Sequence, residues 1–271
     1  MSASARVSGT AERRLATFAV SNLAPLGAVL AVAYALKRFY ASASASELDW
    51  LLAPTTWIVA RLSGHAFVEE RGAGYLSREL GVLIAPSCAG ANYLIVAFVL
   101  LAAGFLTRLP GAKSKWGWLA LSALFAYAAT LAVNATRILL TLAMKSQTLP
   151  RFGLSFEQAH RVEGVVVYLS SLWLLYFAAE AVLASSFSRP RRLWTWIALP
   201  WLAYLGITLV VPLLNGAARN ADFVKHALTV LLVSSVAAAL LAFVCSSLRA
   251  RRAGRFTHTR AARFRLSSRL S

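Results

Sequence analysis

Long apolar runs separated by short polar segments dominate the pattern of this 271-residue chain. A transmembrane helix needs about 20 predominantly apolar residues. Six runs read as membrane-spanning helices, at residues 15–36, 92–106, 116–143, 164–187, 193–214 and 226–247. The pattern therefore predicts an all-α polytopic integral membrane protein with about six full transmembrane helices.

A seventh apolar segment, residues 48–62, is short and contains Pro54. Trp50 and Trp57 lie within it, and tryptophan is enriched where a membrane meets water. We expect this segment to form a re-entrant or interfacial helix rather than a full crossing.

The polar stretch that follows has the composition of short strands. Residues 67–70 and 80–84 carry large apolar side chains and are joined through Gly72 and Gly74. We expect a short extended extracytoplasmic segment here, which leads directly into Cys88 at the start of the second long apolar run.

The overall composition supports a membrane protein. Hydrophobic residues make up 59% of the chain and the mean hydropathy is +0.63, whereas soluble domains are roughly half apolar. A formal net charge of +18 would indicate nucleic-acid binding in a soluble protein. Here the basic residues cluster between apolar runs and in the tail, where they orient the protein in the membrane, so no nucleic-acid partner is expected. No small-residue cleavage site follows the first apolar run, which we expect to be a permanent span rather than a signal peptide.

The distribution of charge predicts the topology. With a cytoplasmic N-terminus and no crossing by residues 48–62, each short inside segment holds three basic residues and the tail from Arg249 holds eight arginines. Eight of the 10 acidic residues then lie outside. A crossing by residues 48–62 would invert this bias. We therefore predict cytoplasmic segments at residues 1–14 and 249–271, and a single membrane-embedded domain at residues 15–248.

Cys88 is the first candidate for chemistry. The predicted topology puts the two cysteines, Cys88 and Cys245, on opposite sides of the membrane, so Cys88 is expected to be a free thiol. A cysteine commonly serves as a small buried hydrophobe. The alternative is a nucleophile: Pro86 and Gly90 flank it as helix breakers, and Ser87 is a candidate N-cap. Cys88 would then lie in the first turn of the next helix, which stabilises a thiolate.

Arg137 lies inside the third long apolar run, where an arginine costs about 2.5–3.5 kcal/mol at mid-helix on insertion scales. Thr130, Asn134, Arg137 and Thr141 recur at steps of four, three and four, which places them in one polar stripe on the helix. The arginine is close enough to the helix end for its side chain to reach the interface, but that does not account for Asn134. We favour a polar cavity in which the guanidinium holds a carbonyl oxygen or a developing oxyanion.

His160 lies at the entrance to the fourth apolar run. Interfacial histidines are common and need no catalytic role. The functional alternative is a general base that takes the thiol proton and later protonates the leaving amine. Glu157 and Glu163 each lie three residues away, so on a helix either can orient the imidazole. Gly164 allows close approach of a neighbouring helix.

Cys88, Arg137 and His160 come from three successive spans and meet one predicted membrane face. This combination suits acyl transfer through a thioester. The sequence contains no metal-ligand spacing and no phosphate-binding loop, so no metal or cofactor is expected.

Other polar residues are weaker candidates. His65 and His226 are isolated and are expected at the interface, and Cys245 is expected in the core. Glu180 lies inside the fourth run and needs a partner that the sequence does not identify. The arginine-rich tail from Arg249 is expected to be disordered or bound to anionic lipid.

Three motifs, taken together, resemble the exosortase/archaeosortase family. They are Pro86-Ser87-Cys88-Ala89-Gly90-Ala91-Asn92-Tyr93, Asn134-Ala135-Thr136-Arg137-Ile138 and His160-Arg161-Val162-Glu163-Gly164, in the family's order. The likeness covers residues 48–186 and is greatest to the exosortase K branch, through the run from Gly74 to Cys88 and the His-Arg-x-Glu-Gly motif. Alanine at position 89 stands where serine is frequent, a departure that should matter little to mechanism.

The resemblance implies a cysteine protease/transpeptidase of the bacterial cytoplasmic (inner) membrane that acts on its extracytoplasmic face. The implied substrates are exported proteins with a C-terminal sorting signal, made of a short motif, a transmembrane helix and a basic cluster. An envelope polysaccharide or lipid is the implied acceptor. By resemblance, Cys88 is the nucleophile, Arg137 the transition-state stabiliser and His160 the acid/base. The expected supporting residues are Asn134, Glu163, Glu157, Gly90 and Asn92.

Two other classes of function fit parts of the pattern. A small transporter or channel would use Asn134 and Arg137 to line a polar path, although the paired broken helices typical of such sites are not evident. A non-enzymatic envelope scaffold would need neither residue. Loss of function in Arg137→Ala but not in Cys88→Ala would favour the transporter, and tolerance of both changes would favour the scaffold.

Overall fold

The computed structural model describes the backbone of residues 3–145, 153, 155–183, 193–219 and 221–267. Among those residues, six helices are long and apolar enough to cross a membrane. Their spanning portions are Ser21–Ser42, Pro86–Leu106, Ala112–Lys145, Phe156–Leu183, Trp194–Leu214 and Asp222–Leu248. The prediction of a mostly helical, multi-pass membrane protein is confirmed at this level.

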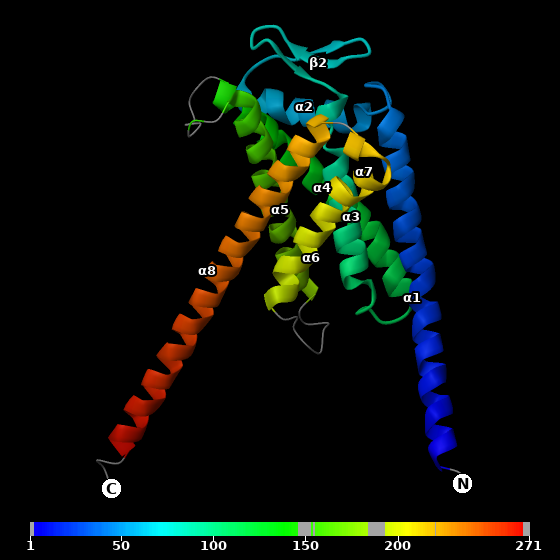
Figure 1. Cartoon of the computed structure of the whole chain (residues 1–271), viewed down its shortest axis with the longest axis vertical. Helices are drawn as coiled ribbons and strands as arrows, with labels where there is room; N and C mark the ends of the chain where they lie inside the picture. Colours follow the sequence, from blue (N-terminus) through cyan, green and yellow to red (C-terminus); the bar gives the residue numbers. More distant parts are fainter. Residues whose placement is uncertain (1–2, 146–152, 154, 184–192, 220, 268–271) are drawn as a thin grey trace.

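Four of the six candidate spans lie within single α-helices, one joins the 3-10 turn Pro86–Cys88 to α3, and one is a broken helix. The uninterrupted helices are α1 (Ala3–Ser42), α3 (Ala91–Leu106), α4 (Ala112–Lys145), α5 (Phe156–Leu183) and α8 (Ala221–Ser267). The broken helix runs through α6 (Leu193–Leu205), a π-helical turn (Gly206–Val210) and α7 (Val211–Leu214). Figure 1 shows α1 and α8 extending well past the other helices at one end of the bundle.

The centre of the bundle is α3, which packs against α1, α4, α5 and α6. It is apolar on every side, as expected for a helix with protein neighbours all round, and most of its residues are buried. The ring of Phe105 lies 5.6 Å from the ring of Trp118 and 5.1 Å from that of Tyr176, measured between centroids. Gly104 leaves room for this packing, because a Cβ there would lie 3.3 Å from the Tyr176 ring.

The segment predicted at residues 48–62 forms α2 (Asp49–Ser63), which is not one of the six candidate spans. Figure 1 shows α2 lying across the end of the bundle, beneath the strands. Leu51 and Val59 are fully buried, whereas Trp57 is 63% exposed. One side of α2 is thus buried in the protein, while Trp57 is exposed; its position relative to the membrane surface stays a prediction.

Three short strands follow α2. They are β1 (Val68–Glu70), β2 (Gly74–Ser77) and β3 (Val82–Ile84), in an antiparallel sheet of order β1-β2-β3. The sequence predicted the outer two strands and treated Gly74 as part of their connection, so β2 was missed. Glycine is required at this position, since its φ is +121° and a Cβ would lie 2.2 Å from the carbonyl oxygen of Ile84.

Two side chains attach the sheet to the helices. The Tyr75 hydroxyl donates a hydrogen bond to Asp49 on α2 at 2.6 Å. Burial and the Asp49 carboxylate raise the pKa of Tyr75 to about 12, so it remains a donor at neutral pH. Lys145, the last residue of α4, donates to the carbonyl oxygens of Leu80 and Gly81 at 2.8 and 3.0 Å. The segment before Cys88 is therefore fixed to both α2 and α4.

Buried polar pairs join the helices at the end of the bundle opposite the sheet. Arg108 Nη1 donates to both carboxylate oxygens of Glu180 on α5, at 2.8 and 2.7 Å. Lys115 on α4 is 4% exposed, and its Nζ donates to Asn22 Oδ1 on α1 at 2.8 Å. Glu180 thus has the partner that its position required, and the two pairs tie α5 and α1 to the central helices.

The basic C-terminal tail differs from the expectation of disorder. The backbone of α8 continues from its spanning portion to Ser267, so the described part of the tail, from Arg249 to Ser267, is helical. Binding of this tail to anionic lipid stays a prediction.

Replacing Arg108 by methionine is expected to lower the free energy of unfolding by about 3–5 kcal/mol, because it leaves the buried Glu180 carboxylate uncompensated. The double variant Arg108→Met/Glu180→Met removes both charges and is expected to recover most of this loss. Thermal unfolding of the detergent-solubilised chain, followed by tryptophan fluorescence, measures both effects. A double variant no more stable than Arg108→Met alone would contradict the pairing.

Candidate active site

Cys88 closes a short 3-10 turn, Pro86–Cys88, that precedes α3. The α-helix itself begins at Ala91, and no side chain caps it. The expectation that Ser87 caps this helix and that Cys88 lies in its first turn is therefore wrong. The reason is Gly90, whose left-handed conformation separates the 3-10 turn from the helix.

Gly90 also lets the cysteine turn lie directly against α4. Its φ is +73°, and a Cβ there would lie 3.0 Å from Asn134 Cγ and 3.2 Å from Thr130 Cγ2. Asn134 Nδ2 donates a hydrogen bond to the Cys88 carbonyl oxygen at 2.5 Å. The polar stripe predicted on this helix thus holds the cysteine segment in place.

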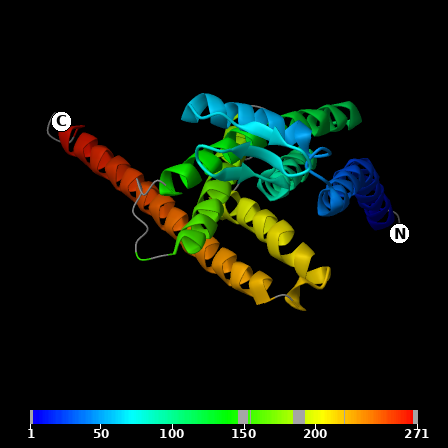
Figure 2. The ribbon, with the colours of Figure 1, turned by 90° about the horizontal axis from the view of Figure 1, so that it is seen from above.

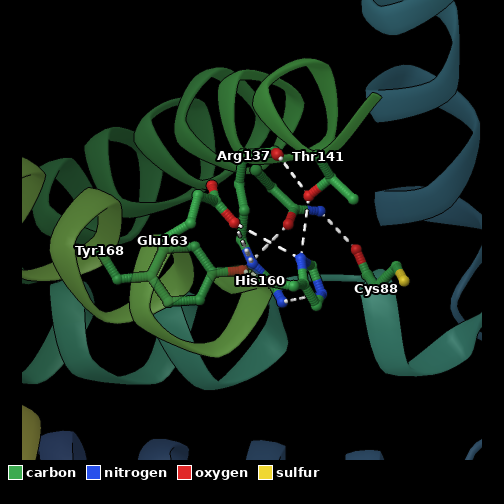
Figure 3. A network of polar contacts seen from close by, with 7 residues as sticks. Cys88, Arg137, Thr141, His160, Glu163 and Tyr168 are labelled. Atoms are coloured by element: carbon green, nitrogen blue, oxygen red, sulfur yellow. Dashed lines mark hydrogen bonds and ion pairs between the residues drawn. The ribbon is translucent and has the colours of Figure 1, made fainter. Parts of the chain in front are cut away.

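Arg137 is the centre of the polar network in Figure 3. Its Nη2 donates to His160 Nε2 at 3.0 Å, and its Nη1 donates to the Tyr168 hydroxyl at 3.3 Å. The Tyr168 hydroxyl in turn donates to Asn134 Oδ1 at 3.0 Å, which links the arginine to the helix position that holds the cysteine turn. Gly164 makes room for the guanidinium, because a Cβ there would lie 3.0 Å from Arg137 Nε.

The hydrogen bonds of His160 define its tautomer. Thr141 Oγ1 donates to the Arg137 carbonyl oxygen at 2.9 Å and therefore accepts from His160 Nδ1–H, which lies 3.0 Å away. The other ring nitrogen, Nε2, accepts from Arg137 and carries no proton. This tautomer leaves Nε2 as the basic nitrogen of the imidazole.

Only one of the two predicted glutamates supports this histidine. Glu163 is nearly buried, and its Oε2 lies 3.5 Å from His160 Nδ1 and 3.9 Å from Arg137 Nε. Glu157 instead pairs with Arg161, and its side chain is 73% exposed. The expectation that Glu157 can orient the imidazole is therefore wrong, because its carboxylate turns toward solvent.

A capping box explains why His160 lies within a helix rather than in the loop before it. The Ser155 N–H donates to Gln158 Oε1 at 3.0 Å, and the Gln158 N–H donates to Ser155 Oγ at 3.2 Å. α5 therefore begins at Phe156, well before the apolar run starts at Gly164. His160 is held rigidly on this first part of the helix.

Asn92, on the first turn of α3, binds the end of α1. Lys37 Nζ donates to Asn92 Oδ1 at 2.6 Å. Asn92 also lines the cavity next to the network, so its supporting role is to hold α1 against the site.

A polar cavity of about 270 Å³ adjoins these residues. Its lining comes from six helices and the cysteine turn: Tyr40, Ser87, Gly90, Ala91, Asn92, Tyr93, Arg137, His160, Arg161, Gly164, Val165, Tyr168, Tyr204 and His226. Cys88 follows directly on Ser87, which lines the cavity together with Arg137. The cavity is thus a space in which a ligand can meet both the cysteine turn and the arginine.

The Cys88 thiol makes no hydrogen bond to His160. In Figure 3 the Cys88 sulfur points away from His160. Among the described residues, the one polar atom recorded near Sγ is Ser87 Oγ, at 4.0 Å. Catalytic hydrogen bonds are often absent from a ligand-free site and form when substrate binds. The structure therefore brings Arg137, His160 and Glu163 together and leaves the thiol beside them, unbonded to the base.

Tyr168 is the member of the network that sequence reasoning missed. It lies four residues after Gly164 and eight after His160, so all three share one face of α5. That spacing is a signal that could have identified it. Its ring also lies under the guanidinium, with Arg137 Cζ 5.3 Å from the ring centroid, so it binds the arginine by its hydroxyl and by its face.

The polar stripe on α4 is buried between helices of the bundle. Thr130 and Asn134 are fully buried, and both make the hydrogen bonds that their positions allow: Thr130 to the Ala126 carbonyl, and Asn134 to Cys88 and Tyr168. This arrangement gives no particular support to a path for transported solutes.

The helices and their apolar lengths define a multi-pass membrane architecture. No protein-family model matches the chain, and comparisons with curated proteins and with solved structures give no match. The functional argument therefore rests on the residues of the site.

Gly90→Ala is expected to destabilise the protein more than Gly72→Ala, by about 1–3 kcal/mol. Both glycines have a positive φ, at +73° and +76°, so both variants incur the same backbone strain. Only at Gly90 would the new methyl group meet other atoms, while nothing lies within 4 Å at Gly72. Thermal unfolding of the two variants in detergent measures the difference, and equal losses would contradict the close packing of the cysteine turn on α4.

Proposed function

We propose that this chain is a membrane-embedded cysteine protease/transpeptidase that cleaves C-terminal sorting signals. The observation that carries the proposal is the network that links the three candidate residues from three helical elements. Arg137 binds His160 directly. Through Tyr168 and Asn134 it is also linked to the backbone of Cys88. The resemblance of the three sequence motifs to the exosortase/archaeosortase family points the same way.

In the first step, His160 Nε2 takes the thiol proton of Cys88 and the sulfur attacks the scissile carbonyl carbon. The carbonyl electrons move to oxygen, where the Arg137 guanidinium stabilises the negative charge. As the tetrahedral intermediate collapses, the C–N bond breaks and the leaving amine takes the proton from His160. The product is a thioester on Cys88 and a released C-terminal segment.

In the second step, a hydroxyl or amine of the acceptor attacks the thioester carbonyl. His160 accepts the proton of that nucleophile and returns it to the sulfur, which leaves as the free thiol. Water in place of the acceptor gives hydrolysis by the same route. The acceptor, an envelope polysaccharide or lipid, remains part of the proposal.

The hydrogen bond between Arg137 and His160 in the ligand-free site supports an exchange of hydrogen-bond partners during the first step. Nε2 is occupied by a hydrogen bond from Arg137, so the imidazole cannot take a proton there without losing that bond. Protonation of His160 would release Nη2 to the developing oxyanion at the moment when that charge forms. Glu163, near both groups, would stabilise the imidazolium.

The membrane placement follows from the same proposal. The sheet, α2 and the cysteine turn lie at one end of the bundle (Figure 1), and the Arg108 and Lys115 pairs lie at the other. Basic segments face the cytoplasm in multi-pass proteins. We therefore place the protein in the bacterial cytoplasmic membrane with its site on the extracytoplasmic side, where it would meet exported substrates.

Cys88→Ala is expected to abolish processing, and Arg137→Lys is expected to slow it by roughly 10²–10³-fold, because lysine cannot reproduce the guanidinium fork. Mass spectrometry of C-terminal peptides from envelope proteins, in cells with each variant, reports whether transmembrane C-terminal segments are removed. Cys245→Ala is the matched control and should process normally. Undiminished cleavage in Cys88→Ala would refute the proposal.

Two introduced cysteines test the side of the membrane. In a Cys88→Ala/Cys245→Ala background, Arg71→Cys lies on the exposed turn between β1 and β2, and Lys113→Cys lies on the exposed start of α4. A membrane-impermeant maleimide is expected to label the Arg71→Cys protein in intact cells and the Lys113→Cys protein only after permeabilisation. The reverse pattern would overturn the extracytoplasmic site.

A further inference from the structure

One wall of the cavity takes no part in the reaction proposed above. It is formed by Tyr40 of α1, Tyr204 of α6, His226 of α8 and Arg161 of α5. Arg161 and His226 come from α5 and α8, which pack against each other, and both line the cavity. Figure 2 shows α5, α6 and α8 running side by side at this part of the bundle.

The hydroxyl of Tyr204 is the most informative group of this wall, because the residue is buried. The residue is 5% exposed and lines the cavity, yet its hydroxyl has no hydrogen-bond partner among the residues that the structure describes. The Tyr40 hydroxyl and the His226 ring also lack such a partner within the described part of the chain. Tyr204 is thus a buried residue with an unused donor at the cavity, and Tyr40 and His226 add two half-buried donors. Because buried polar groups are nearly always hydrogen-bonded, this combination suits a bound group that supplies acceptors.

The charge of the cavity restricts what that group is. Two guanidinium groups, of Arg137 and Arg161, and two imidazoles, of His160 and His226, line it, and none of its lining residues is acidic. Glu163 lies behind Arg137, where it is nearly buried, and Glu157 holds Arg161 from the solvent side. The interior of the cavity therefore offers positive charge and donors, which suit an oxyanion.

We propose that the wall of Tyr40, Tyr204, His226 and Arg161 is a binding site for a phosphate group. Two tyrosine hydroxyls, an imidazole N–H and a guanidinium supply donors from four different helices, which matches a tetrahedral group with several acceptor oxygens better than a planar carboxylate with two. Tyr40, Arg161 and His226 lie near the ends of their spanning helices, and Tyr204 lies near the middle of the broken helix. The phosphate is either that of a lipid headgroup or free phosphate.

The proposal concerns binding alone and stands apart from the reaction at Cys88. It is therefore tested on the full-length Cys88→Ala protein, purified in dodecyl maltoside because this detergent carries no phosphate. Isothermal titration with dihexanoyl phosphatidic acid is expected to show saturable binding. Failure of the proposed reaction would leave this result unchanged, and failure to bind would leave the reaction untouched.

Conservative variants locate the site. Tyr204→Phe removes only the hydroxyl and is expected to weaken binding about tenfold, and Arg161→Gln about tenfold or more, as for hydrogen bonds to a charged group. The matched controls are Tyr34→Phe, on the exposed face of α1, and Arg71→Gln, on the β1–β2 turn. Both controls should bind like the parent protein. Equal binding by Tyr204→Phe and Tyr34→Phe would overturn the assignment of the wall.

Two further titrants decide the chemistry. Inorganic phosphate that binds as tightly as dihexanoyl phosphatidic acid would identify free phosphate as the ligand, and much weaker binding would identify the lipid headgroup. Both results keep the phosphate site. An acetylated peptide with a single glutamate that displaces dihexanoyl phosphatidic acid at equal concentration would overturn it, because the wall would then be a carboxylate site. Absence of saturable binding to any phosphate compound would also overturn it.

Discussion

The burial of the Arg137 guanidinium constrains the site more than any other interaction. A charge inside a helical bundle has to be compensated by neighbouring groups. Here those groups come from α5, where the Tyr168 hydroxyl and ring, His160 and Glu163 surround the guanidinium. The faces that α4 and α5 turn toward each other are therefore determined by one side chain. The absence of a side chain at Gly164 is part of the same arrangement, since the guanidinium occupies that space.

The rest of the fold keeps this pair of helices in position from both ends. At one end, Arg108 and Lys115 make the buried polar contacts that join α3 to α5 and α4 to α1. At the other end, α2 and the sheet cover the bundle, as Figure 1 shows. Between them, α3 supplies the apolar centre on which the other helices pack. Polar contacts thus lie at the two ends of a largely apolar structure, where they set the positions of its helices.

Hydrophobic patterning was enough to predict the six spans and the short helix α2, because length and apolar content decide both. Arg137 and His160 could be identified because a charged or titratable group in or beside an apolar run is conspicuous. Tyr168 was not, because tyrosine is ordinary in such a run and its importance depends on a partner from another helix. The turn at Cys88 was misjudged for a related reason. Glycine at position 90 is compatible with a helix start, and only its contact with Asn134 requires the left-handed conformation.

The three hydrogen bonds that α4 makes to residues 80–88 constrain the length of this segment. Lys145 binds the carbonyl groups of Leu80 and Gly81, and Asn134 binds that of Cys88. These points lie about three turns apart on α4, or roughly 16 Å along a straight helix. The fixed spacing of Asn134 and Lys145 on α4 therefore sets the distance that the segment between Gly81 and Cys88 has to span. Exchanges of exposed side chains within it leave the register intact, whereas a one-residue insertion or deletion would shift the cysteine relative to Arg137 or detach the segment from the helix.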